Sequence, residues 1–166
     1  MIDVFISHPS PFNTTQKDFL ALIEESLNSH GLNPVNLGKN SWDFRSPLKP
    51  IKEIMSRCKA AIIIGLERDH CYIGYEKESS EDEKEYVHKF RSSSWIQIEA
   101  GMAYQTGLPL LILKEKKLYP DGILDPLNSD YFVFEFELEK IKETLSKELE
   151  EIILSWVNHI KTSNQK

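Results

Sequence analysis

The residues best suited to chemistry lie within residues 94–103, which read SWIQIEAGMA. Ser94 and Gln97 have the spacing of a helix N-cap and its third residue, so we expect a helix that begins here. Trp95 and Glu99 are four residues apart and would share one face of that helix. A carboxylate can stabilise a developing positive charge, and an indole ring can stack on a planar ligand or form a wall of the pocket. The ordinary alternative is that Trp95 anchors the helix in the core and Glu99 is a solvated acid near the helix start.

Two loops carry further candidate binding residues. Ser7 and His8 follow the first apolar run, where a hydroxyl is suited to bind ribose or phosphate and an imidazole supplies charge. Their alternative is an ordinary turn with a solvated histidine. Trp42, Phe44 and Arg45 lie together in a polar loop, where the guanidinium suits a diphosphate and the aromatic rings suit stacking. The same three residues equally suit contact with a second copy of the chain.

Short apolar runs alternate with segments of helical period, and this alternation must position the candidates. We expect strands at 4–6, 33–37, 60–65, 108–113 and 131–136, and the first four are separated by helical segments. The pattern predicts an α/β fold, a five-stranded parallel sheet with helices on both faces. The simplest strand order is the flavodoxin-like 2-1-3-4-5, in which ligands bind at the carboxyl ends of the strands. Ser7 and the start of the helix at Trp95 would both lie at that edge.

Two segments depart from the alternation. An insertion at about 69–92 contains residues 76–85 (EKESSEDEKE), whose six acids and two lysines show no apolar periodicity. Such a segment cannot bury a face, so we expect an exposed, solvated loop that is helical in part, with a regulatory or partner-binding lid as the alternative. The segment at about 138–162 places its apolar residues on one stripe, which predicts a long C-terminal amphipathic helix. We expect a single domain that spans residues 1–166.

The composition bounds the class of function. The chain has 166 residues, 40% of them hydrophobic and 28% charged, which is typical of a globular domain. A net charge of −6 argues against binding of nucleic acid through many phosphate contacts. The apolar runs are too short to cross a bilayer and the start lacks a signal-peptide pattern, so we expect a cytoplasmic protein without membrane contact. The two cysteines and five histidines lack the spacing of metal ligands, and no metal is expected.

Three motifs, in order, resemble those of TIR (Toll/interleukin-1 receptor) domains. Trp95-x-x-x-Glu99 resembles the WxxxE motif of that family, and residues 4–8 (VFISH) resemble its first strand. Residues 31–33 (GLN) resemble the Gly-Leu step into the second strand. Residues 38–50 would then be the loop after the second strand, which is called the BB loop in TIR domains.

The resemblance covers residues 3–136 and implies a bacterial TIR-like domain with the flavodoxin-like fold. It implies that Glu99 is catalytic in an NAD⁺ nucleosidase, which gives nicotinamide and ADP-ribose or a cyclic form of it. NAD⁺ is then the substrate, and no cofactor is needed. That reaction fits a single carboxylate, because the pyridinium leaves as a neutral base and needs no proton. The resemblance also implies homo-oligomers through TIR–TIR contacts, a partner effector or sensor protein, and a role in antiphage defence.

Two other functions stay open. Residues 99–109 (EAGMAYQTGLP) are similar to the E-x-G-x-A segment of nucleoside 2-deoxyribosyltransferases, which also break N-glycosidic bonds with a glutamate on this helix. That reaction must protonate a neutral base and so needs a second acid, for which Asp69 is the nearest candidate. TIR domains also serve as non-catalytic adaptor and oligomerisation modules. In that case the loop at Trp42 and the terminal helix would be interaction surfaces.

Overall fold

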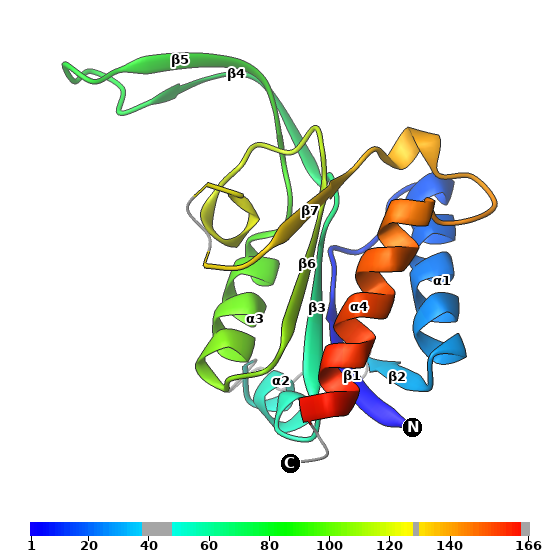
Figure 1. Ribbon diagram of the computed structural model, residues 1–166. Helices are drawn as coiled ribbons and strands as arrows, with labels where there is room; N and C mark the ends of the chain where they lie inside the picture. Colours follow the sequence, from blue (N-terminus) through cyan, green and yellow to red (C-terminus); the bar gives the residue numbers. More distant parts are fainter. Residues whose placement is uncertain (38–47, 128–129, 164–166) are drawn as a thin grey trace.

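A parallel sheet forms the centre of the molecule (Figure 1). The computed structural model describes residues 1–37, 48–127 and 130–163. The strands of this sheet are β1 (Ile2–Ser7), β2 (Leu32–Val35), β3 (Ala60–Gly65), β6 (Leu110–Glu115) and β7 (Val133–Phe136). They lie in the order β2-β1-β3-β6-β7, and every neighbouring pair is parallel. Counted along the chain, this is the expected order 2-1-3-4-5, so the prediction of a flavodoxin-like fold is confirmed.

Helices cover both faces of the sheet. The helices α1 (Thr14–Ser29) and α4 (Lys147–Ser163) pack on one face, and α2 (Leu48–Met55) and α3 (Ser94–Gln105) pack on the other. Successive side chains of a strand point to opposite faces. In β3, Ile62 accordingly joins the cluster under α1 and α4, whereas Ile63 joins the cluster under α3. All six residues of β3 are buried, as its uninterrupted apolar sequence predicts.

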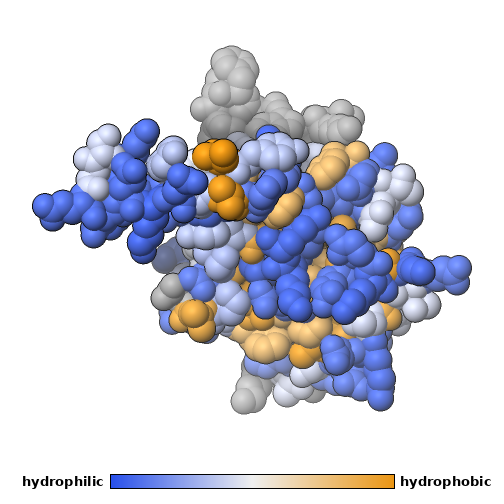
Figure 2. Space-filling model, turned by 90° about the horizontal axis from the view of Figure 1, so that it is seen from above, coloured by the Kyte–Doolittle hydropathy of each residue, from blue (hydrophilic) through white to orange (hydrophobic). Residues whose placement is uncertain are grey.

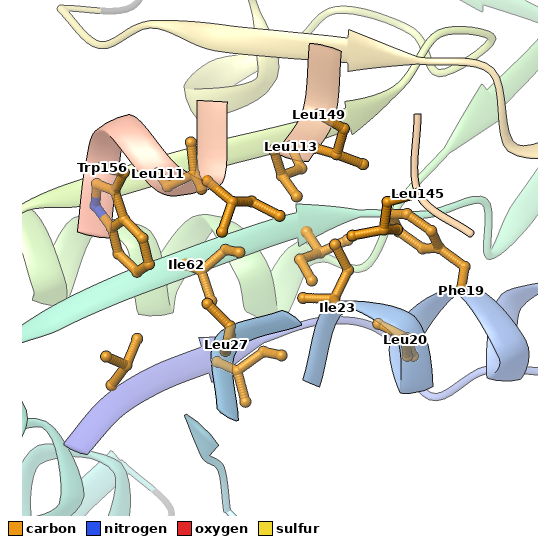
Figure 3. Close-up of a cluster of buried hydrophobic side chains, with 14 of the residues drawn as sticks. Phe19, Leu20, Ile23, Leu27, Ile62, Leu111, Leu113, Leu145, Leu149 and Trp156 are labelled. Carbon is orange, nitrogen blue, oxygen red and sulfur yellow. The ribbon is translucent and has the colours of Figure 1, made fainter. Parts of the chain in front are cut away.

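The core under α1 and α4 fixes these two helices on the sheet (Figure 3). Phe19, Ile23 and Leu27 repeat at helical spacing on α1, and all three are buried. Figure 3 shows α1 side chains facing those of the sheet, with Leu149 approaching from α4. The ring of Phe19 stacks on Phe136 with centroids 4.5 Å apart. Each such side chain stabilises the fold by about 1.5–3 kcal/mol when it is fully buried. Their packing holds α1 and α4 against the sheet.

The start of α3 differs from the expectation by one residue. Ser93, not Ser94, is the N-cap, and its Oγ accepts a hydrogen bond from the backbone of Trp95 at 3.3 Å. With Ser93 as the N-cap, the third helical residue is Ile96 and no capping box forms; the side chain of Gln97 instead accepts a hydrogen bond from the backbone of Ile123 at 2.8 Å. A tertiary contact has therefore replaced the local one.

The C-terminal helix is shorter than expected. Residues 138–140 form a 3₁₀ turn, and α4 begins only at Lys147. Ser146 starts it, since its Oγ accepts a hydrogen bond from the backbone of Leu149 at 3.3 Å. Leu138, Ile141 and Leu145 are buried nonetheless. The apolar stripe therefore predicts burial correctly but extends the helix about two turns too far.

The acidic insertion is a β-hairpin and not the expected loop or partial helix; we call it the arm and define it as residues 69–91. It consists of β4 (Asp69–Glu76) and β5 (Lys84–Arg91), which pair with each other in a separate antiparallel sheet. Figure 1 shows the arm projecting from the carboxyl edge of the main sheet, away from the helices. Only its acidic tip lacks a pattern. Its flanks carry β-branched and aromatic residues such as Ile73 and Val87, which favour strands.

Candidate active site

A pocket of about 740 Å³ opens at the carboxyl edge of the sheet. We call it the carboxyl-edge pocket. The end of β1, the loop into α1, the end of β2 and the start of α3 surround it, and Phe5 and Ile51 contribute apolar surface. Its volume falls within the range of about 300–1,000 Å³ that is common for small-molecule sites. Its position is where ligands bind in folds of this class.

Glu99 and Ser7 meet in this pocket. The Oγ of Ser7 donates a hydrogen bond to Oε2 of Glu99, although the two residues are 92 positions apart in the sequence. Ser7 is the last residue of β1 and is only 1% exposed, so it is a rigid donor. Glu99 is half-buried. Burial raises the pKa of Glu99, and the hydrogen bond from Ser7 opposes that rise by favouring the carboxylate.

Trp95 lies one helical turn before Glu99 and lines the same pocket. It is also half-buried and packs against the cluster that contains Phe5, Ile51 and Met55. Trp95 therefore anchors α3 in the core, and it also lines the pocket, where its proposed contact with a planar ligand stays a prediction. The anchoring fixes where the next turn of α3, and hence Glu99, meets the end of β1.

Small residues bring α3 close to the sheet, but not all of them do so. Ala100 and Ala103 are fully buried and belong to the clusters beneath the helix. Gly101 is exposed, and a Cβ placed on it would meet nothing within 4 Å. The close approach of α3 therefore depends on the two alanines and not on the glycine that the sequence pattern emphasises.

His8 lines the pocket beside Ser7 and is half-buried. Its Nδ1 lies 2.9 Å from the carbonyl oxygen of Pro9. A carbonyl oxygen only accepts, so the proton of this hydrogen bond belongs to Nδ1. The other ring nitrogen, Nε2, is then an acceptor in neutral His8 and a donor in the cation.

Two cationic residues of the pocket are absent from the sequence-based candidates. Lys17 comes from the first turn of α1 and Arg68 from the loop after β3, and both are exposed at the rim. Nη1 of Arg68 donates to Oγ of Ser93 at 3.1 Å, and its backbone N donates to the carbonyl of Arg91 at 2.9 Å. The carboxyl-end rule selects the loop after β3, but nothing in the sequence distinguishes Arg68 from its neighbours.

A network of charged and polar groups fixes the chain just before Arg68. The carbonyl of Glu67 accepts from Nε2 of Gln16 at 2.8 Å, and its backbone N donates to Oε2 of Glu115 at 2.7 Å. Nζ of Lys117 lies 2.7 Å from Glu67 and 2.9 Å from Glu115. Desolvation acts to lower the pKa of Lys117, but its hydrogen bonds to both carboxylates prevail and raise it. The network therefore joins α1, β3 and β6 at the edge of the site.

The structure thus brings together four of the seven candidates, and Trp42, Phe44 and Arg45 lie outside the described residues. Glu99 is the only acid that lines the pocket among the residues described.

Within the described residues, no group of three or more histidine, cysteine and acidic side chains is arranged to hold a metal ion. No helix in the described ranges is both long and apolar enough to cross a membrane. Comparisons with models of protein families, with curated proteins and with solved structures found no match to this chain.

Proposed function

We propose that this protein is a TIR-like NAD⁺ nucleosidase and that Glu99 is its catalytic residue. One observation carries the proposal: a half-buried carboxylate, held by a buried serine, lines a nucleotide-sized pocket at the carboxyl edge of a flavodoxin-like sheet. The WxxxE-like spacing of Trp95 and Glu99 supports the same assignment. The proposal extends to a bacterial antiphage role in the cytoplasm, where release of nicotinamide and ADP-ribose depletes NAD⁺ or makes a signal.

The proposed reaction requires one anionic group near the ribose. The bond between ribose C1′ and the nicotinamide nitrogen breaks, and its electron pair goes to the ring nitrogen, so nicotinamide leaves neutral. The positive charge moves to the ribose as an oxocarbenium ion, which the carboxylate of Glu99 stabilises. Because this carboxylate is partly removed from water, its attraction for the developing cation is screened less than at an exposed site. Water then attacks C1′ and loses a proton to solvent, which completes ADP-ribose.

The remaining groups of the pocket suit the rest of NAD⁺. Trp95 offers an aromatic surface for a planar ring one turn from the carboxylate. Lys17 and Arg68 place two cations at the rim, where a diphosphate would carry compensating charge. The pyridinium itself favours the ionised form of Glu99, because an opposite charge lowers the pKa of a carboxyl group. Substrate binding and the formation of the active carboxylate therefore support each other.

Among the described residues no second acid lines the pocket, and this favours NAD⁺ cleavage over transfer of deoxyribose. A neutral base leaves an N-glycosidic bond only when a general acid protonates it. Asp69, the nearest candidate for that acid, is exposed at the root of the arm and does not line the pocket. A pocket with one carboxylate, as the described residues have it, matches a substrate whose base is already cationic.

The test is product identification by mass spectrometry after the purified chain has been incubated, in separate reactions, with NAD⁺, deoxynucleosides and nucleotides. We expect nicotinamide with ADP-ribose or its cyclic form from NAD⁺, and unchanged nucleosides. The reaction is measured from low to high protein concentration, because TIR domains commonly need assembly for activity. Release of base from nucleosides with intact NAD⁺ would instead identify a deoxyribosyltransferase-like enzyme. No turnover of any substrate at any concentration would contradict the proposal and leave the adaptor function.

A further inference from the structure

The arm meets the body chiefly around Tyr119. The backbone of Tyr119 donates a hydrogen bond to the carbonyl of Phe90 at 2.8 Å, its hydroxyl donates to Glu76 at 3.2 Å, and its ring centre lies 3.3 Å from Nζ of Lys89. In the described part of the chain, the ladder of β4 and β5 includes no strand of the main sheet. A ribbon of two strands is only marginally stable in water by itself, so a ligand that links the two strands would stabilise the arm.

Two histidines of the arm meet across the ribbon. His70 lies on β4 and His88 lies on β5, and Nε2 of His70 is 3.2 Å from Nδ1 of His88. His70 lies opposite Phe90 in the register, so His88, two residues away on β5, is its diagonal neighbour. The two histidines are 18 positions apart, a separation that forms no local metal-binding motif in the sequence. Only the pairing of the hairpin brings their nitrogens together.

Aromatic neighbours hold the ring of His70. This imidazole stacks on the ring of Phe90 with centroids 4.1 Å apart, and its centroid is 4.3 Å from that of Tyr72. The rings of Tyr72 and His88 meet edge to face at 5.5 Å. His70 is half-buried by these contacts, whereas His88 is exposed. The pair therefore combines one nitrogen that is held in place with one whose ring is free to adjust.

The backbone of His88 adopts an unusual conformation. Its φ of +50° lies in the left-handed region, which residues with a Cβ rarely adopt. A hairpin turn does not require it, because the ladder continues on both sides of His88, with Lys89 opposite Cys71 and Val87 opposite Ile73. Strain of this kind is concentrated at functional positions, where it sets the direction of a side chain.

We propose that His70 and His88 bind one divalent transition-metal ion, such as Zn²⁺ or Ni²⁺, through Nε2 of His70 and Nδ1 of His88. Bonds from imidazole nitrogen to zinc are about 2.0–2.1 Å long, so two such nitrogens on one ion lie about 2.8–3.4 Å apart at bond angles of about 90–110°. The separation of 3.2 Å between the two nitrogens falls within that range. Imidazole is also a ligand that zinc, copper and nickel prefer.

Water completes the coordination of the ion. Among the described residues no third histidine, cysteine or acid joins the pair, so water molecules fill the remaining positions. The view from above in Figure 2 shows the arm as a largely hydrophilic projection, which an ion reaches directly from solvent. Both imidazoles bind the ion in the neutral form. The proton shared by the two rings moves to the other nitrogen of its own ring, so two neutral histidines release no proton.

The bound ion links β4 to β5. An ion that binds the folded arm and not the separated strands stabilises the folded arm by mass action. The histidine pair does not line the carboxyl-edge pocket, so this inference does not depend on the enzymatic proposal.

The test is isothermal titration calorimetry of the full chain, freed of metal by a chelator, with Zn²⁺ and separately with Ni²⁺. We expect the wild type to bind one ion per chain, and His88→Asn and His70→Phe each to bind at least about tenfold more weakly, since even the loss of a group that only orients a metal ligand costs about 10–100-fold in affinity. Asparagine tolerates the left-handed conformation, and phenylalanine keeps the stacking on Phe90, so both variants should keep their fold, which circular dichroism checks.

Two control variants separate this pair from other metal ligands. His159→Asn changes an exposed histidine of α4, and Cys71→Ser removes the thiol beside His70, and both should bind the two ions as the wild type does. Wild-type chain that binds neither ion would overturn the proposal. So would binding that both histidine variants retain, or binding that Cys71→Ser abolishes.

Amide hydrogen exchange locates the ion on the arm. With Zn²⁺ added, exchange in residues 69–76 and 84–91 should slow in the wild type, because opening of the ribbon then requires release of the ion, and it should not change in His88→Asn. Zinc that binds to the wild type without slowing exchange in these two strands would show that the ion lies elsewhere and would refute the assignment.

Discussion

Replacing Glu99 by glutamine should stabilise the folded protein while it removes the proposed catalytic group. Burial raises the pKa of Glu99 in the folded state, so the folded protein favours its protonated form. At neutral pH the ionised carboxylate is therefore less favourable in the fold than in the unfolded chain. Glutamine has a similar shape, is never charged, and still offers an oxygen to the hydroxyl of Ser7.

The expected gain results from two opposed effects. A hydrogen bond to a charged acceptor contributes about 1.5–3 kcal/mol and one to a neutral acceptor about 0.5–1.5 kcal/mol, so the change weakens the bond from Ser7. The raised pKa of Glu99 shows that desolvation of the charge outweighs that bond. The net gain in the free energy of unfolding should be on the order of 1 kcal/mol, within the range of single stabilising changes at functional sites. For a chain of 166 residues this corresponds to a rise in Tm of about 2–4 °C.

The dependence on pH identifies the cause. Glu99 has a folded pKa above its unfolded one, so the wild type is most stable, as far as this group is concerned, below the ordinary pKa of glutamate. Its stability falls as the pH rises toward the folded pKa and is level above that value. Urea unfolding of both proteins should give equal stability near pH 4 and a growing advantage for Glu99→Gln toward pH 8. A variant that is less stable than the wild type at pH 8, or a difference that does not vary with pH, would refute this reasoning.

Two further substitutions test the pocket. Ser7→Ala removes the donor to Glu99 and should lower the free energy of unfolding by about 1.5–3 kcal/mol at neutral pH. Thermal unfolding would detect this as a Tm lower by about 3–12 °C. An unchanged Tm would show that the hydrogen bond does not stabilise the fold in solution. Arg68→Ala should reduce kcat/KM for NAD⁺ by about 10–100-fold, mainly through KM, because a charge-assisted contact to the diphosphate is lost. Steady-state kinetics with Arg57→Ala, an exposed arginine outside the pocket, provides the control, and equal losses in the two variants would argue against a role in binding.

Much of the fold can be predicted from the local sequence, because apolar patterns indicate the strands and capping residues indicate the helix ends. The run AAIIIG at 60–65 is apolar throughout because β3 is covered on both faces. Asn13 caps α1 by accepting from the backbone of Gln16, and Gly31, with φ of +82°, adopts the left-handed conformation just beyond the end of that helix. Once the strand order is known, the carboxyl end of β1 and the start of α3 are expected at the same edge of the sheet, which places Ser7 near Glu99.

The remaining features depend on contacts that no local pattern encodes. The apolar residues at 138–145 are buried without being helical, because a 3₁₀ turn and a loop serve the core as well as a helix does. The acidic run at 76–85 conceals the strands on either side of it, because composition averages over a tip and its flanks. Arg68 enters the site because the network around Glu67 and the packing of α3 fix the end of β3. The place of a residue such as Arg68 can therefore be predicted only when the assembled sheet is known.

The most direct test of the central claim compares the rate of nicotinamide release from NAD⁺ by the wild type, Glu99→Gln and Glu25→Gln. Glu25 is an exposed acid of α1 outside the pocket, so its substitution makes the same chemical change without touching the site. We predict that Glu99→Gln lowers the rate by at least about 100-fold, as expected when a group that stabilises transition-state charge is removed, while Glu25→Gln retains the wild-type rate. A folded Glu99→Gln protein that still releases nicotinamide at the wild-type rate would contradict the assignment of Glu99 as the catalytic residue.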